Sequence, residues 1–427
     1  MSASEAPQRL DERQGLGLPP WVVVAAVGLL TGLQPLTTDL YLPALPQMQA
    51  GLGVDAAAAQ WTLSVVILAF GIGQLVWGAI ADRFGRAIVL RWGLGLYVLA
   101  SLAAVLAPDI AVMLAARAAQ GACLSAAVVC GRAMVRDLFA PEDGARVMAK
   151  GMSVLGLLAL SGPVIGGLTV THFGWRPTMA LMALSGLAIW LFVWLRLPET
   201  LPPERRQQRL DWLAIVRQWL DIGRHPTFRA HALLTASTYG GLYVFLALAP
   251  FVFIRVLHLS GTGCGLVMAS TSLAYLSGTV VCRKVLPRGG LLGTVRLAGW
   301  CSLAGGAWMG AASLWQVAQP WGLGVSAFGL LPGLWVYAFA HGIHQPCGQT
   351  GVVAAFPMRA GAASALSGFV LCAVAFGVGA LLAWWSGLPG WAGTIHPMSL
   401  GVALGGALTA WTALRRVQRH GLAHAPA

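Results

Sequence analysis

The sequence predicts an all-α membrane protein whose twelve transmembrane helices form two six-helix bundles. The 427-residue chain is 57% hydrophobic and only 10% charged, whereas soluble domains carry about 25% charged residues. Its apolar runs are long enough to cross a bilayer as helices, and they lack the two-residue alternation of outer-membrane strands. Six runs precede the longest polar stretch and six follow it.

The predicted spans follow one another at short intervals. The first starts at Trp21 behind a cytoplasmic N-terminal tail, residues 1–20, and has no small-residue cleavage site, so we interpret it as a retained span rather than a signal peptide. The N-terminal bundle, residues 21–196, contains spans 21–45, 57–80, 88–107, 110–136, 146–170 and 176–196. The C-terminal bundle, residues 228–416, contains spans 228–254, 264–285, 291–314, 320–343, 361–385 and 397–416.

The polar stretch between the bundles, residues 197–227, is a predicted cytoplasmic linker. Within Leu210–Ile222 the apolar side chains share one helical face, which is typical of a helix lying on the membrane surface. Residues 417–427 form a cytoplasmic C-terminal tail in this prediction.

The net charge of +13 follows the topology rather than indicating a nucleic-acid partner. Of the 27 lysines and arginines, 23 lie in the termini, in the even-numbered loops or in the span ends that flank them. The other four are Arg117, Arg132, Arg176 and Arg255. Cytoplasmic loops of membrane proteins are enriched in basic residues, so both termini are predicted to be cytoplasmic.

No pattern in the chain indicates an enzyme. The seven cysteines form no CxxC pair, which leaves metal and disulfide interpretations without support. The phosphate-binding pattern GxxxxGK[ST] and the hydrolase patterns HExxH and GxSxG are absent. We therefore expect no catalytic residues, no metal and no cofactor.

Asp39 is the only carboxylate inside the predicted spans. An ionisable group at membrane depth costs about 2.5–3.5 kcal/mol, so it is a functional-site candidate by default. Proton transport needs such a group, which makes Asp39 the candidate proton carrier. The alternative is an aspartate that only caps a helix turn.

The turn between spans two and three resembles the loop signature G-x-x-x-D-R-x-G-R of the major facilitator superfamily. Its residues are Gly78, Asp82, Arg83, Gly85 and Arg86. Gly78 is expected to let a neighbouring helix approach, and Gly85 to permit a tight turn. Asp82 is expected to form a conformational latch with a cytoplasmic arginine; the candidates are Arg83, Arg86, Arg132 and Arg136.

Arg117, Gln120 and Gly121 in span four resemble the R-x-x-Q-G motif of the same superfamily. With a rise of 1.5 Å per residue, Asp39 and Arg117 both lie about 10 Å below the outer boundary. We therefore expect Arg117 to interact with Asp39 in proton coupling. The alternative is a purely structural arginine that joins two helices.

Span five resembles the antiporter motif G-x-x-x-x-x-G-P-x-x-G-G of drug/proton exchangers. Its residues are Gly156, Gly162, Pro163, Gly166 and Gly167. Pro163 removes a backbone hydrogen bond and bends the helix, and the glycines provide a face for tight packing. The motif favours export by exchange over symport.

Three further segments, Thr38–Pro46, Arg132–Asp137 and His344–Gln349, resemble the Bcr/CflA drug-resistance transporters. The resemblance implies a monomer in a bacterial inner membrane that exchanges protons for small-molecule drugs. It also implies that spans one, four, seven and ten line a cavity, where the candidate substrate contacts are Tyr41, Gln120, Tyr239, Tyr243, Trp335 and Tyr337. Aromatic residues also serve as interfacial anchors, and that alternative stays open. The second half has no copy of the Asp-Arg loop, so any latch is asymmetric.

These patterns favour a proton-coupled multidrug exporter working by alternating access. A proton-coupled transporter of one physiological metabolite would show the same motifs. A non-transporting membrane sensor or scaffold is the third hypothesis, and the lack of a sizeable soluble domain argues against it.

Overall fold

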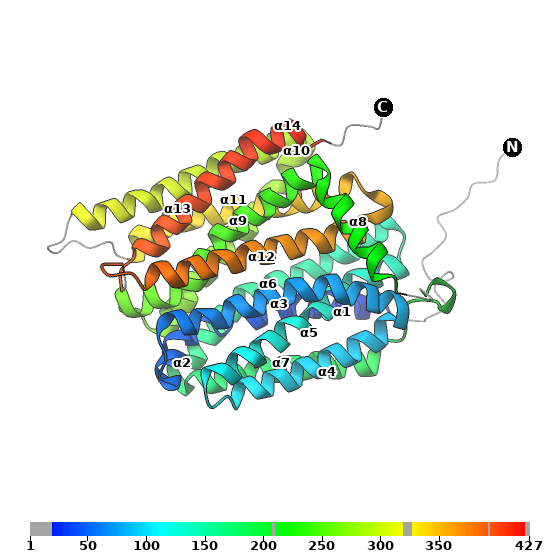
Figure 1. The fold of residues 1–427 in the computed structure, drawn as a ribbon, viewed down its shortest axis with the longest axis horizontal. Helices are drawn as coiled ribbons and strands as arrows, with labels where there is room; N and C mark the ends of the chain where they lie inside the picture. The colour runs from blue at the N-terminus through cyan, green and yellow to red at the C-terminus, as the bar shows by residue number, and fades with distance from the viewer. Residues whose placement is uncertain (1–18, 207–209, 319–326, 392, 423–427) are drawn as a thin grey trace.

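The computed structural model describes residues 19–206, 210–318, 327–391 and 393–422. Across these ranges the chain is helical and contains no strand, which confirms the predicted all-α class. Long helices run side by side in two groups, one from each half of the chain (Figure 1).

The N-terminal group contains six long helices. They are α1 (Pro20–Thr38), α3 (Ala56–Phe84), α4 (Arg86–Val105), α5 (Ile110–Leu138), α6 (Pro141–Phe173) and α7 (Trp175–Arg196). The short helices η1 (Leu42–Ala44) and α2 (Leu45–Leu52) lie between α1 and α3, and η2 (Pro203–Arg205) follows α7.

The C-terminal group follows the linker helix α8 (Trp212–Arg224). It contains α9 (Pro226–Pro250), α10 (Gly261–Ala318), α11 (Ala327–Ala354), α12 (Ala360–Ser386), α13 (His396–Trp411) and α14 (Val417–His420). The short elements η3 (Phe251–Val256), η4 (Pro357–Arg359) and η5 (Thr412–Arg416) adjoin α9, α12 and α13. The α10 segment is two helices joined at a kink, because Gly290 has φ 61° and ψ 179°. The two parts correspond to predicted spans 264–285 and 291–314.

Among the described residues, ten helical stretches are long and apolar enough to cross a membrane. One of them is the kinked α10, and α11 is not among the ten. The first residues of predicted span 320–343 lie outside the described parts. The protein is therefore a multi-pass membrane protein, while the count of twelve spans, the domain boundaries and the side of the termini stay predictions.

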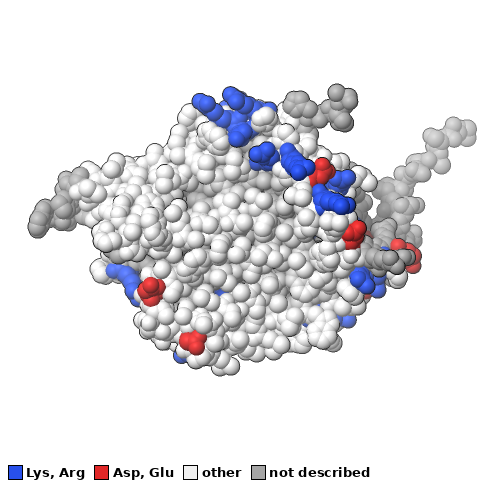
Figure 2. Space-filling model, viewed as in Figure 1, with Lys and Arg blue, Asp and Glu red and all other residues white. Residues whose placement is uncertain are grey.

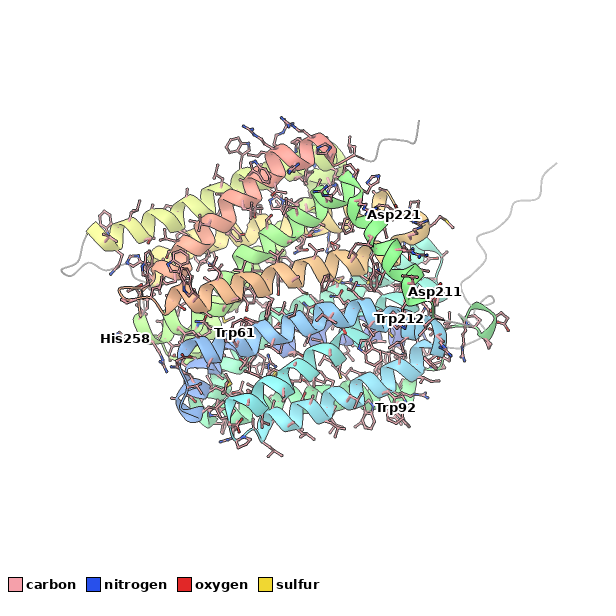
Figure 3. All side chains as sticks on the ribbon, viewed as in Figure 1. Trp61, Trp92, Asp211, Trp212, Asp221 and His258 are labelled. Atoms are coloured by element: carbon pink, nitrogen blue, oxygen red, sulfur yellow. The ribbon has the colours of Figure 1, made fainter. Side chains whose placement is uncertain are left out.

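Most of the lateral surface carries no charged side chain. Figure 2 shows a broad uncharged band, with lysines and arginines concentrated at the end where α8 lies. Asp211, Trp212 and Asp221 lie at this end, and Trp61 and His258 lie at the opposite end (Figure 3). We call these the Asp82 end and the Asp39 end, after the site residues described below.

The predicted linker helix forms as α8. Asp211 caps it, because its Oδ1 accepts a hydrogen bond of 3.0 Å from the Ala214 amide. Four of its large apolar side chains are exposed, namely Trp212, Leu213, Val216 and Leu220. An exposed apolar face is what a helix lying on a membrane surface requires.

Candidate functional site

Asp39 lies where the first predicted span is interrupted. The α1 helix ends at Thr38, and a turn at residues 39–41 leads into the short helix η1. The Asp39 amide still donates to the Pro35 carbonyl at 2.8 Å. Pro43 and Pro46 follow directly and have no amide hydrogen, so a regular helix would lose two hydrogen bonds here. Sequence reasoning missed this break.

The Asp39 carboxylate is partly exposed and has one hydrogen-bond donor among the described residues. Thr38 Oγ1 donates to its Oδ1 at 2.7 Å, and no ion pair reaches it from any described residue. The short helix η1 that follows it packs against α9 of the other helix group. Asp39 therefore lies at the boundary with the C-terminal group.

Arg117 does not bond to Asp39, contrary to our expectation. Its Nη2 donates to the Thr37 carbonyl at 3.0 Å, and its Nη1 donates to Gln120 Oε1 at 2.8 Å. The guanidinium lies over the Tyr41 ring, 4.0 Å from the centroid. Asp39 follows Thr37 by two residues, a rotation of about 200° around a helix, and so its side chain points the other way.

Tyr41 and Gln120 are fixed inside the N-terminal group. Both are fully buried. Gln120 Nε2 donates to Ser101 Oγ at 2.7 Å, and the Tyr41 hydroxyl lies 3.3 Å from Thr62 Oγ1. In this conformation neither side chain is available to a ligand.

The candidates of the C-terminal group differ in their surroundings. Tyr337 is buried and donates to the Thr238 carbonyl at 3.0 Å. Tyr243 is buried and its hydroxyl lies 2.6 Å from Ser64 Oγ of α3, so it joins the two groups. Trp335 is exposed and its Nε1 donates to Ser270 Oγ at 2.9 Å. These three side chains do not form one site.

Tyr239 is the exception, because it is partly exposed and belongs to a ring cluster. Its ring centroid lies 6.1 Å from that of His341, which lies 5.5 Å from that of Tyr275. Thr238 Oγ1 is 3.1 Å from His341 Nδ1. Sequence reasoning missed Tyr275, since no spacing rule relates a residue of α10 to one of α9.

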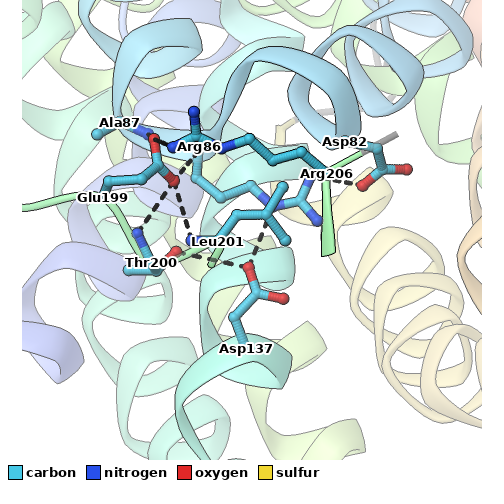
Figure 4. A network of polar contacts seen from close by, with 8 residues as sticks. All are labelled: Asp82, Arg86, Ala87, Asp137, Glu199, Thr200, Leu201 and Arg206. Atoms are coloured by element: carbon cyan, nitrogen blue, oxygen red, sulfur yellow. Dashed lines mark hydrogen bonds and ion pairs between the residues drawn. The ribbon is translucent and has the colours of Figure 1, made fainter. Parts of the chain in front are cut away.

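At the opposite end, Asp82 pairs with Arg86 (Figure 4). Arg86 Nη1 lies 2.6 Å from Asp82 Oδ1, and Arg86 Nε donates to Asp137 Oδ2 at 3.1 Å. Arg86 is thus the partner among the four candidates. In the described parts of the chain, the other three contact no carboxylate: Arg83, Arg132 and Arg136.

Glu199 completes this network and was not predicted from the sequence. Its carboxylate accepts hydrogen bonds from the amides of Arg86 (2.8 Å) and Ala87 (3.2 Å), which begin α4. It also accepts from the amides of Thr200 and Leu201, both at 3.0 Å. A carboxylate at a helix N-terminus is stabilised by free amides and by the helix dipole. Glu199 therefore fastens the end of α7 to the start of α4.

The backbone at this junction requires a glycine at position 85, whereas the space around Gly78 would accept a larger side chain. Gly85 has φ 103°, and a Cβ there would collide with the Glu199 carboxylate. A Cβ at Gly78 would meet its nearest neighbour, Val129, at 3.8 Å. The expectation that Gly78 allows close helix approach is not met here. That approach occurs earlier, where a Cβ at Gly73 would collide with Ser125 of α5.

The glycines of the span-five motif lie where α6 meets other helices. A Cβ at Gly166 would collide with the Leu40 carbonyl beside Asp39, and one at Gly167 with the Gly261 carbonyl that begins α10. A Cβ added at Gly156 would lie 3.1 Å from Leu276 of α10. By contrast, a Cβ added at Gly162 would meet its nearest neighbours, in α1 and the turn after it, only at 3.9 Å. The α6 helix, with Pro163 inside it, therefore packs against both the broken first span and the C-terminal group.

Comparisons with known proteins agree with this architecture. The chloramphenicol resistance protein of Pseudomonas aeruginosa is 28% identical over 350 residues, covering 82% of this chain and 78% of that protein. The bicyclomycin resistance protein homolog of Haemophilus influenzae is 26% identical over 366 residues, covering 85% and 89%. The crystal structure of the human organic anion transporter MFSD10 superposes with a TM-score of 0.70 at 19% identity, covering 93% of this chain and 99% of the other.

The family model for the Major Facilitator Superfamily matches residues 27–380. This range includes most of both helix groups, the Asp39 break and the Asp82 network. The chain therefore belongs to the major facilitator superfamily of membrane transporters.

Proposed function

We propose that this protein exports small amphiphilic drugs in exchange for protons by alternating access. The position of Asp39 carries the proposal. It is the one carboxylate within the predicted spans, and it lies at an unwound break beside the other helix group. A charge change at this position acts directly on the boundary that must open and close.

The contacts between the two groups support this assignment. At the Asp39 end, Arg255 Nη2 of the C-terminal group donates to the Pro46 carbonyl at 3.0 Å. The Thr262 amide donates to Thr171 Oγ1 of α6 at 3.1 Å. Protonation of Asp39 at this end would change the stability of the contacts that hold the two helix groups together there.

The names of two relatives support drug export rather than uptake of a nutrient. Two proteins that cover most of this chain are named for resistance to chloramphenicol and bicyclomycin. The tight α6–α10 packing supports the exchange mechanism proposed for the span-five motif. We place the protein as a monomer in a bacterial inner membrane with both termini in the cytoplasm, consistent with the basic residues at the Asp82 end.

Substitution of Asp39→Asn tests the proposal. The amide keeps the size of the side chain but cannot exchange a proton, so we expect proton-driven efflux to be abolished at unchanged expression. Asp55→Asn is the matched control, because Asp55 caps α3 at the same end and Asn caps helices equally well.

The assay is a growth screen across antibiotic classes in an efflux-deficient host, together with dye efflux from energised cells. Full resistance and full dye efflux by the Asp39→Asn variant would refute proton coupling through this residue. A wild-type protein that moves protons but protects against no antibiotic class would instead indicate a single-metabolite transporter.

A further inference from the structure

Two histidines inside the C-terminal group have no part in the mechanism proposed above. His341 lies near the midpoint of α11, and His344 follows about one turn later on the same side of the helix. His344 is fully buried and His341 is 4% exposed. An ionisable group at membrane depth is costly and is a functional-site candidate by default, so this pair is a candidate for the same reason as Asp39.

The His344 ring lacks hydrogen-bond partners. The Ala298 carbonyl of α10 lies near the ring, yet neither Nδ1 nor Nε2 makes a hydrogen bond of normal geometry with any described residue. A buried polar group without a partner costs about 1–3 kcal/mol. Folded proteins contain few such groups, and each calls for an explanation such as a bound water, a bound ion or a chemical role.

His341 connects His344 to a cluster of partly exposed rings. Its Nδ1 lies 3.1 Å from Thr238 Oγ1, whereas no described residue bonds to its Nε2. The Tyr239 and Tyr275 ring centroids lie 6.1 and 5.5 Å from that of His341. Both phenols are partly exposed and have no hydrogen-bond partner among the described residues. Since α11 packs against both α9 and α10 (Figure 1), polar groups lead from His344 to rings that a water-sized molecule can reach.

The surroundings of the pair carry no charge. No carboxylate of the described residues acts on either imidazole, and no acidic residue follows Asp221 in the sequence. Every arginine and lysine of α9 and α10 is exposed, and α11 has none. The titratable groups that face the pair are ordinarily neutral, namely Tyr239 of α9, Tyr275 and Cys282 of α10, and Tyr337 and Cys347 of α11.

A third histidine of this group is already bonded. His231 of α9 lies with its Nε2 2.9 Å from the Gly421 carbonyl. Histidine is the side chain that ordinarily changes charge near neutral pH. His341 and His344 are therefore the residues with which the C-terminal half can hold a proton close to the ring cluster.

We propose that His341 and His344 form a second proton-binding site, which works together with Asp39 of the N-terminal group. The ligand is a proton, because His344 is fully enclosed and a proton can pass along rings and single waters. It adds to a ring nitrogen to give imidazolium, and its release restores the neutral ring, so no other bond changes. The inference rests on the proposed proton exchange and places one charge-changing site in each helix group, near the depth at which transporters bind coupling ions.

The rings can be observed directly, without a drug. Full-length protein with 15N-labelled histidine, in phosphatidylcholine nanodiscs, is titrated by NMR over about pH 9 to 5, which brackets the ordinary pKa of histidine. His341→Gln and His344→Gln identify the two sets of ring signals, since each removes one set. His344→Asn gives the same assignment if the Gln variant does not fold. His420→Gln is the control, because it removes an exposed histidine at the end of α14.

We expect both rings of the wild-type protein to shift from the signals of neutral imidazole to those of imidazolium within this range. Each single variant should move the titration midpoint of the remaining ring, because interacting sites titrate as a pair. His420→Gln should leave both midpoints unchanged. Rings that stay neutral throughout the range would overturn the inference, as would two rings that titrate without affecting each other.

Vesicle transport gives the functional arm of the test. Ethidium accumulation and the accompanying proton movement are measured together in inside-out vesicles. The number of protons moved per ethidium should fall in His344→Gln, because one proton site is lost, and should match wild type in His420→Gln. A purely structural histidine would lower the transport rate and leave this ratio unchanged, and that result would overturn the inference. Ethidium transport by wild type without proton movement would instead refute the proposed function, while the NMR titration would still decide whether the pair binds a proton.

Discussion

The two loop-motif glycines should respond in opposite directions to alanine. Gly85 has φ 103° and ψ 156°, a region almost exclusive to glycine that costs other residues about 1–3 kcal/mol. Its new Cβ would also displace the Glu199 carboxylate from the α4 amides, and a hydrogen bond to a charged group contributes about 1.5–3 kcal/mol. Gly85→Ala should therefore destabilise the fold by about 2.5–6 kcal/mol.

Gly78 is helical, and a Cβ added there would have no neighbour closer than 3.8 Å. Alanine is favoured over glycine inside a helix by about 0.5–1 kcal/mol, so Gly78→Ala should be neutral or slightly stabilising. Thermal unfolding of the detergent-solubilised variants, followed by tryptophan fluorescence, measures both effects. The reasoning fails if Gly85→Ala unfolds at the wild-type temperature, or if the two variants lose the same stability.

Three further substitutions test separate contacts. Asp82→Asn removes the ion pair with Arg86. Because Asp82 is partly exposed, the free energy of unfolding should fall by no more than about 1 kcal/mol. The transport rate should fall more than the equilibrium affinity for the drug. Equal loss of affinity with unchanged turnover would contradict a latch. Glu199→Gln should lower the unfolding temperature, because it weakens the hydrogen bonds to the first amides of α4. Glu204→Gln is the control at an exposed residue nearby and should leave the unfolding temperature unchanged. Equal unfolding temperatures for the two variants would show that the cap is dispensable. Arg117→Met should lower the unfolding temperature without moving the pH optimum of export, and a shifted optimum at normal stability would restore the coupling role.

The helices were predictable because hydropathy and helix length follow from local sequence. The kink in α10 falls in the gap between predicted spans 264–285 and 291–314, where Lys and Arg residues around Pro287 interrupt the apolar run. Gly85 was identified for the right reason, because a glycine between two helices indicates a turn with positive φ. Glu199 was not found, because its bonds to Arg86 and Ala87 join segments more than a hundred residues apart.

The predicted Asp39–Arg117 contact failed for a different reason. Counting residues along straight helices gives depth but not direction around the helix axis. Arg117 does reach α1 at the predicted level, yet it bonds to the Thr37 carbonyl. The break after Thr38 then turns Asp39 away, and the packing of α6 against the Leu40 backbone holds that break in place.

The Asp82 network lies entirely within the N-terminal group. Asp82, Arg86, Asp137 and Glu199 join the ends of α3, α4, α5 and α7, and none of the ion pairs among the described residues links the two helix groups. The network therefore joins the helix ends of the N-terminal group to one another and does not by itself connect this group to the C-terminal group. At this end Arg136, the residue next to Asp137, lies against the first turn of α12 in the C-terminal group. A rearrangement that releases Asp137 from Arg86 would therefore move Arg136 relative to α12.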